Sequence, residues 1–135
     1  MTRVLVIDDE PDVRDVLRRV LERGGYEVAT AVDSGSGLAA CRQQTPDVVV
    51  TDIIMPNEHG VDLIRKLRAE FPALAIIAIS GGGNAAVAGY QPGTVKTEAY
   101  MAAASQAGAD VCLTKPFERE VLLSNIDALV KSRTH

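Results

Sequence analysis

Short, uninterrupted apolar runs recur along this chain, and they constrain its fold more than any other feature of the sequence. A strand with apolar side chains on both faces is buried on both faces, as in a parallel sheet covered by helices on each side. Five segments fit this description, the second more weakly than the others: residues 4–7, 27–31, 48–50, 75–79 and 111–113. We therefore predict a parallel sheet of five strands.

Helical patterns lie between these runs. The clearest covers residues 11–23, where apolar side chains recur every three or four positions and form one stripe that must face a sheet. Gly24 and Gly25 follow it and are predicted to end the helix in a left-handed turn. Ser34 is predicted to cap a second helix that reaches about residue 43. Three more helices are predicted, at residues 60–70, within 94–107 and from 118 to about 131.

Five strands that alternate with five helices predict an α/β fold, with right-handed crossovers and helices on both faces of one doubly wound sheet. The 135 residues are enough for one such domain with a buried core. We predict a single domain over residues 1–135 without a separate output domain, since the last predicted helix ends close to the C-terminus.

The charge balance and the cysteines argue against several classes of function. A net charge of -4 does not favour a sequence-independent grip on nucleic acid, which needs clustered basic side chains. Cys41 and Cys112 lack the spacing of a zinc site or of a disulfide framework. The first apolar run is too short for a signal peptide or a membrane span, so we predict a cytoplasmic protein. Its partner is expected to be a protein or a small molecule, with no direct contact to nucleic acid or membrane.

Polar side chains gather at the carboxyl ends of the predicted strands, where open α/β sheets form their sites. If the first and third strands are neighbours, three carboxylates meet there and repel one another unless a cation lies among them. Oxygen ligands of this kind favour Mg²⁺, and nearby ammonium and hydroxyl groups suit a phosphoryl group. A carboxylate beside them can act as a nucleophile. The residues concerned are Asp8, Asp9, Asp52, Ser80, Thr114 and Lys115.

Each of these residues also has an ordinary structural explanation. Residues 8–10, the acidic stretch Asp8 to Glu10, can serve as a cap and a favourable charge at the start of the first helix. Asp52 can be a turn residue, and Lys115 a solvated charge before a proline. Their joint placement at successive strand ends favours a shared site.

Four segments together resemble the receiver domain of two-component response regulators, and the resemblance covers nearly the whole chain. In chain order they are VLVIDDE, VVVTDIIMPNEHG, AIS and LTKPF. An acidic pair, a DxxMPxxxG stretch and a KPF stretch are highly specific in combination. The resemblance implies a CheY-like (βα)5 fold, related to flavodoxin, with strand order 2-1-3-4-5.

The resemblance also implies a role for each residue of the site. Asp52 corresponds to the phosphoacceptor, which takes a phosphoryl group from the phosphohistidine of a sensor histidine kinase or a histidine phosphotransfer protein. Ser80 is expected to turn toward that group and Lys115 to pair with it. The resemblance implies that the protein is a switch rather than an enzyme, and that it catalyses only its own phosphorylation and dephosphorylation.

The implied metal is Mg²⁺. Asp9 and Asp52 are expected to bind it together with the backbone carbonyl of Ile54, and Asp8 largely through a bound water.

Signalling in this family commonly uses the surface of the fourth helix, fifth strand and fifth helix, here about residues 94–131. Kinase contact is often made by the first helix and by the loop after the fifth strand. This makes Val13, Leu17, Pro116 and Phe117 candidates, with ordinary packing as the alternative for all four.

Two departures from the family pattern stand out. Cys112 occupies the position, three before the lysine, where the family often has an aromatic switch residue. In addition, Ser80 and Lys115 are separated by roughly a dozen residues more than is usual. The excess lies in or near the glycine-rich segment 81–94, for which we predict a lid or a reshaped entrance to the fourth helix. That segment lacks the GxGxxG and Walker patterns of nucleotide-binding loops.

We therefore predict a stand-alone receiver that signals by altered protein docking or by phosphorelay. One alternative is that the chain is the receiver part of a longer regulator. Another is a receiver-like binding module that works without phosphorylation, although Asp9, Asp52 and Lys115 are all present. A haloacid-dehalogenase-like phosphatase, which also uses an aspartyl phosphate, would need a DxDxT stretch that this chain lacks.

Overall fold

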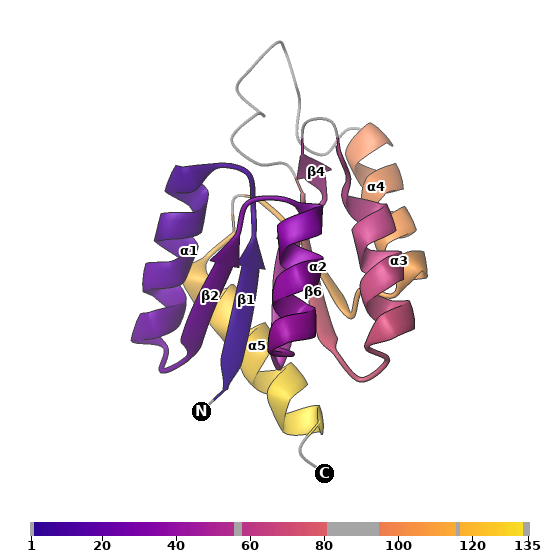
Figure 1. The fold of residues 1–135 in the computed structure, drawn as a ribbon. Helices are drawn as coiled ribbons and strands as arrows, with labels where there is room; N and C mark the ends of the chain where they lie inside the picture. The colour runs from indigo at the N-terminus through magenta and orange to yellow at the C-terminus, as the bar shows by residue number, and fades with distance from the viewer. Residues whose placement is uncertain (1, 56–57, 81–94, 116, 134–135) are drawn as a thin grey trace.

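The computed structural model describes residues 2–55, 58–80, 95–115 and 117–133, and its main sheet is parallel throughout. The strands lie in the order β2-β1-β3-β6-β7, so the predicted 2-1-3-4-5 arrangement is confirmed (Figure 1). Their bounds are Arg3–Ile7 for β1, Glu27–Ala31 for β2, Val48–Asp52 for β3, Ala75–Ser80 for β6 and Val111–Thr114 for β7.

Within the described residues, four helices connect these strands and a fifth follows β7. They are α1 (Pro11–Arg23), α2 (Ser34–Gln43), α3 (Gly60–Glu70), α4 (Val95–Ala107) and α5 (Arg119–Arg133). None of the helices in the described ranges is both long and apolar enough to cross a membrane.

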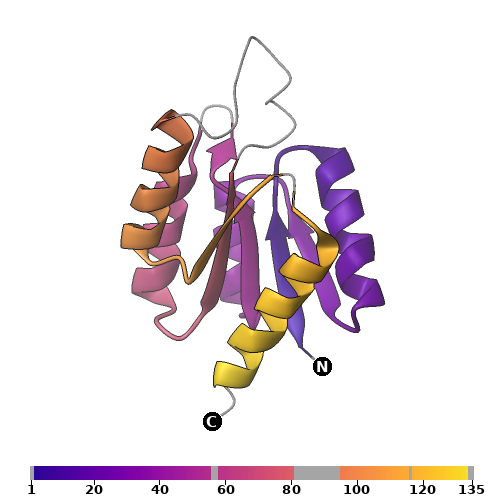
Figure 2. The ribbon, with the colours of Figure 1, turned by 180° about the vertical axis from the view of Figure 1, so that it is seen from behind.

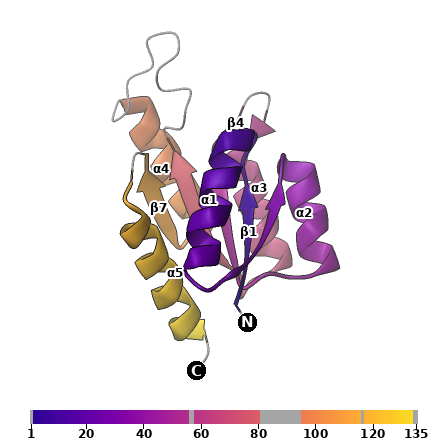
Figure 3. The same cartoon turned by 90° about the vertical axis from the view of Figure 1, so that its left-hand side faces the viewer.

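Alternation along the strands divides the core into two layers. Successive strand side chains point to opposite faces, so each strand supplies both layers. Helices α2, α3 and α4 pack on one face, and α1 and α5 on the other (Figures 1 and 2). The side view of Figure 3 shows α2 and α5 on opposite sides of β1. The first face receives Leu5, Ile7, Val49, Ile76 and Ala78, and the second receives Val4, Val6, Val48, Val50, Ala75, Ile77 and Ile79.

Two helix ends differ from the prediction. The cap of α2 is Asp33 rather than Ser34, because the Asp33 carboxylate accepts the backbone N–H of Ser36 at 2.8 Å. That bond also lowers the pKa of Asp33. At the end of α1, only Gly25 is left-handed, with φ of 94°, whereas Gly24 stays in the right-handed helical region with φ of -76°.

A short antiparallel hairpin that the sequence did not predict follows β3. It pairs β4 (Ile54–Met55) with β5 (Glu58–His59) and leads directly into α3. A Cβ atom on Gly60, the first residue of α3, would collide with the backbone of Ile53. The glycine of the DxxMPxxxG stretch therefore lets α3 begin against the residue that follows Asp52.

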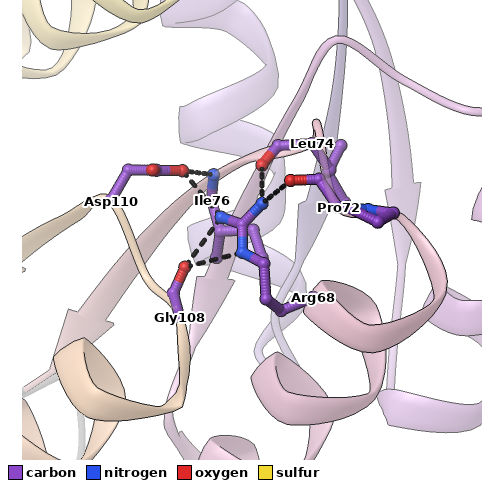
Figure 4. A network of polar contacts seen from close by, with 6 residues as sticks. All are labelled: Arg68, Pro72, Leu74, Ile76, Gly108 and Asp110. Carbon is purple, nitrogen blue, oxygen red and sulfur yellow. Dashed lines mark hydrogen bonds and ion pairs between the residues drawn. The ribbon is translucent and has the colours of Figure 1, made fainter.

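Arg68, near the end of α3, ties together three segments at the edge of the sheet opposite the strand carboxyl ends (Figure 4). Its guanidinium pairs with the Asp110 carboxylate at 3.0 Å, and the same carboxylate oxygen accepts the backbone N–H of Ile76 at 2.8 Å. The guanidinium also donates to three backbone carbonyls, those of Pro72, Leu74 and Gly108. One side chain thus connects α3 with the start of β6 and with the turn between α4 and β7.

The Glu70–Arg42 ion pair between α3 and α2 is expected to make stability pH-dependent. The two side chains form a bidentate pair with both distances 2.8 Å, and this lowers the pKa of Glu70. A lowered pKa stabilises the folded state above the unfolded pKa, about 4.3, and the contribution disappears as pH falls through the folded value. Glu70→Gln should therefore lower the urea midpoint at pH 7 and leave it nearly unchanged at pH 3. An equal effect at both pH values, or the same pH dependence in an Arg42→Met background, would contradict this.

Candidate functional site

Three carboxylates lie together at the carboxyl ends of β1 and β3. The two strands are paired in register, with Ile7 opposite Thr51, so the residues that follow are neighbours. One oxygen from each of Asp8, Asp9 and Asp52 lies within 4.8 Å of the others. Asp8 and Asp52 are almost completely buried, at 2% and 5% exposed. Ionised carboxylates this close together repel one another, and a cation among them offsets that repulsion.

Lys115 supplies positive charge to this acidic pocket. Its Nζ lies 3.4 Å from Oδ2 of Asp52 and 3.5 Å from Oδ2 of Asp8, and the side chain is only 15% exposed. The backbone N–H of Lys115 donates to the carbonyl of Ser80 at 2.9 Å, which continues the pairing between β6 and β7. The sheet register therefore brings the lysine to the carboxylates from far along the chain.

The acidic pair has its own local support. Oδ1 of Asp8 accepts the backbone N–H of Glu10 at 2.9 Å, and the Asp8 carbonyl accepts a hydrogen bond from Arg14 at 2.6 Å. Glu10 is the N-cap residue of α1 but makes no side-chain capping bond, so a capping role does not explain its presence. Sequence reasoning missed Arg14, whose one signal was its place one turn into the helix after the acidic pair.

Ser80 ends β6 at the same edge, but its hydroxyl is directed elsewhere. The residue is fully buried, and Oγ donates to Sδ of Met101 on α4 at 3.0 Å. On β7, the Cys112 thiol lies 3.7 Å from the carbonyl oxygen of the same methionine. Burial raises the pKa of the Cys112 thiol, which keeps it in the protonated, donating form. Met101 was not singled out by the sequence, since a methionine on an alanine-rich helix is usually a packing residue.

The residues predicted as candidates for kinase contact are mostly packed in the core. Leu17 is buried, and Val13 and Phe117 pack against the same core layer, as the ordinary-packing alternative expected. Val16 is the residue of α1 with a large exposed apolar side chain, at 58%. Pro116 and the glycine-rich segment 81–94 lie outside the described residues.

Ile54 begins β4, two residues after Asp52. The hairpin and the contact between Ile53 and Gly60 therefore define the backbone path immediately beyond the acidic pocket.

Comparison with known proteins gives this arrangement a family. The family model described as "Response regulator receiver domain" matches residues 4–127. The chain is 35% identical over 128 residues to the probable transcriptional regulatory protein TcrX of Mycobacterium tuberculosis, covering 95% of this chain and 49% of TcrX. It is 34% identical over 132 residues to protein PilH of Pseudomonas aeruginosa, covering 96% of this chain and 98% of PilH.

Solved structures of receiver domains are also similar to this chain. A response regulator receiver domain protein from Clostridium thermocellum superposes with a TM-score of 0.83 at 29% identity, over 99% of this chain and 98% of that one. A CheY-like receiver domain protein from Methanospirillum hungatei gives a TM-score of 0.82 at 25% identity, over 99% and 97%. The chain thus spans about half of TcrX and nearly all of PilH. This chain belongs to the response regulator receiver domain family.

Proposed function

We propose that this receiver is a phosphorylation switch whose phosphoacceptor is Asp52. The observation that carries the proposal is the convergence of Asp52 with two further carboxylates and the Lys115 ammonium at one buried edge. A carboxylate nucleophile needs a group that neutralises the incoming phosphoryl charge, and Lys115 lies within reach of it. The proposed donor is the phosphohistidine of a sensor histidine kinase or of a histidine phosphotransfer protein.

The acidic pocket fits a Mg²⁺ ion by its donor chemistry. All three side chains offer carboxylate oxygens, which are hard ligands, and Mg²⁺ binds through one or two carboxylates while keeping several waters. Asp9 and Asp52 would hold the ion directly with the Ile54 carbonyl, and Asp8 through water. When bound, the ion supplies charge neutralisation for the phosphoryl oxygens.

In the transfer step, an Asp52 oxygen attacks phosphorus as the phosphorus–nitrogen bond of the phosphohistidine breaks. The imidazole nitrogen keeps the bonding electron pair and takes up a proton, and Asp52 becomes an acyl phosphate. Lys115 then pairs with a phosphoryl oxygen instead of with the free carboxylates. The Ser80 hydroxyl donates to another phosphoryl oxygen.

The proposed output is a change in protein docking, or relay of the phosphoryl group, through the surface of α4, β7 and α5. A local change of charge biases an element that has two arrangements. The chain spans about half the length of relatives such as TcrX. The partners of those longer proteins are therefore not carried over, and the partners named for this chain are proposed. A receiver inside a longer regulator would use the same chemistry with a different output.

Intact-mass measurement tests the proposed function. The purified protein is incubated with Mg²⁺ and a small-molecule phosphodonor such as acetyl phosphate, beside Asp52→Asn and a metal-free sample. One added phosphoryl group is expected for the wild type with Mg²⁺, and none for either control.

Addition that survives in Asp52→Asn would place the phosphoacceptor elsewhere. No addition to the wild type, from acetyl phosphate or from a phosphorylated histidine phosphotransfer protein, would favour a binding module that works without phosphorylation.

A further inference from the structure

The Ser80 hydroxyl has an unusual partner in the resting protein. Ser80 is 0% exposed, and a buried hydroxyl needs a hydrogen-bond acceptor. The acceptor at 3.0 Å is the thioether sulfur of Met101, a weaker acceptor than an oxygen. The side chain that is to meet the phosphoryl group is therefore directed at α4 when no phosphoryl group is present.

Met101 is held from a second strand as well. The Cys112 thiol on β7 reaches the Met101 carbonyl at 3.7 Å, from the position that is often aromatic in the family. The side chain of Met101 is thus joined to Ser80 at the end of β6, and its backbone carbonyl to Cys112 within β7. We define Ser80, Met101 and Cys112 as the sulfur latch.

Over residues 101–107, α4 contacts the sheet mainly through small side chains. Its side chains there are mostly those of alanine, and Ala104 is the fully buried one among them. Alanine buries little apolar area, so each contributes little to docking of the helix. The C-terminal end of α4 is anchored, because the Arg68 guanidinium donates a hydrogen bond to the carbonyl of Gly108, the residue that follows the helix. Gly108 has a φ of 127°, which ends the helix there. The helix is fixed near Gly108, and within residues 101–107 the sulfur latch adds two polar attachments to the sheet.

We propose that Met101 is the resting-state acceptor for Ser80 and the positioning residue through which phosphorylation releases α4, a role that rests on the proposed function. A phosphoryl oxygen is charged, and a hydrogen bond to it is roughly twice as strong as one between neutral groups. The hydroxyl therefore leaves the sulfur when Asp52 is phosphorylated, and α4 loses the hydrogen bond that joins Met101 to β6. Here a thioether and a thiol replace the aromatic switch that the family often uses.

Amide hydrogen exchange of the unphosphorylated protein tests the latch itself. Met101→Leu keeps the apolar volume and removes the acceptor. Faster exchange of the amides of residues 101–107, by about threefold to tenfold, is expected from the loss of one hydrogen bond. Ser80→Ala should give a similar increase, and the double variant no further increase. Leu129→Met, which exchanges the same two side chain types on α5, should leave these amides unchanged.

Binding of beryllofluoride, a stable mimic of the phosphoryl group, tests the coupling. With Mg²⁺ present, Met101→Leu is expected to bind beryllofluoride about threefold to tenfold more tightly, because the resting state has lost its acceptor. The same substitution in a Ser80→Ala background should have no effect on affinity.

An equal effect of Met101→Leu with and without the Ser80 hydroxyl would show simple packing and overturn the proposal, as would unchanged exchange and affinity. Failure of every variant to bind beryllofluoride would instead overturn the proposed function, while the exchange measurement would still decide whether the latch exists.

Discussion

Replacing Lys115 by methionine is expected to change two properties of the acidic pocket in opposite directions. The Mg²⁺ affinity should rise by about tenfold, because the ammonium that now lies 3.4 to 3.5 Å from two carboxylates no longer competes for them. Phosphorylation by acetyl phosphate should slow by about a hundredfold, because the developing phosphoryl charge loses its cation. Isothermal titration measures the first property, and intact mass against time measures the second.

Lys66→Met is the matched control, since Lys66 is exposed on α3. It should change neither quantity by more than about twofold, in line with the small effect of surface charges. If Lys115→Met lowered both the Mg²⁺ affinity and the rate, the lysine would be organising the carboxylates rather than balancing their charge.

Replacing Arg68 by methionine is expected to lower the free energy of unfolding by about 3 kcal/mol, because several acceptors lose a charged donor at once. The methionine keeps part of the apolar stem but leaves the Asp110 carboxylate and three carbonyls without the guanidinium. Arg68→Lys should recover less than half of the loss, since one ammonium cannot reproduce the planar fork. Urea unfolding followed by circular dichroism gives the free energies.

Arg65→Met provides the comparison on the same helix. Arg65 is 61% exposed and pairs with Asp62 one helical turn away, so its loss should cost about 0.5 kcal/mol or less. Equal losses at positions 65 and 68 would mean that the network in Figure 4 contributes no more than a surface ion pair.

The sequence was most informative where periodicity and burial agree. The bounds of α1 and α3 match the prediction, because each has an apolar stripe and a clear stop. Residues 48–50 marked β3, although the strand extends to Asp52, since a polar residue at a strand end interrupts the apolar run without ending the hydrogen-bond pairing. Strand order rested on family resemblance, because periodicity along one strand carries no information about its neighbours.

For the candidate site, too, the sequence predicted the residues but not their arrangement. Asp8, Asp9, Asp52 and Lys115 could be named from the sequence, since charged side chains at the ends of buried strands need a shared reason. Their mutual distances depend on parallel register across β1, β3, β6 and β7, which only the folded sheet provides.

The sequence by itself determined the alternation of strands and helices and the chemical character of the strand ends, because local hydrophobic periodicity and residue type are written along the chain. The tertiary structure alone decided that the Ser80 hydroxyl donates to the sulfur of Met101. It also decided that Arg68, at the opposite edge of the sheet, donates to the carbonyl of Gly108. The first contact joins residues 21 positions apart, and the second joins residues 40 positions apart. Such pairs are selected by the packing of α4 against the sheet and α3, and no local pattern encodes them.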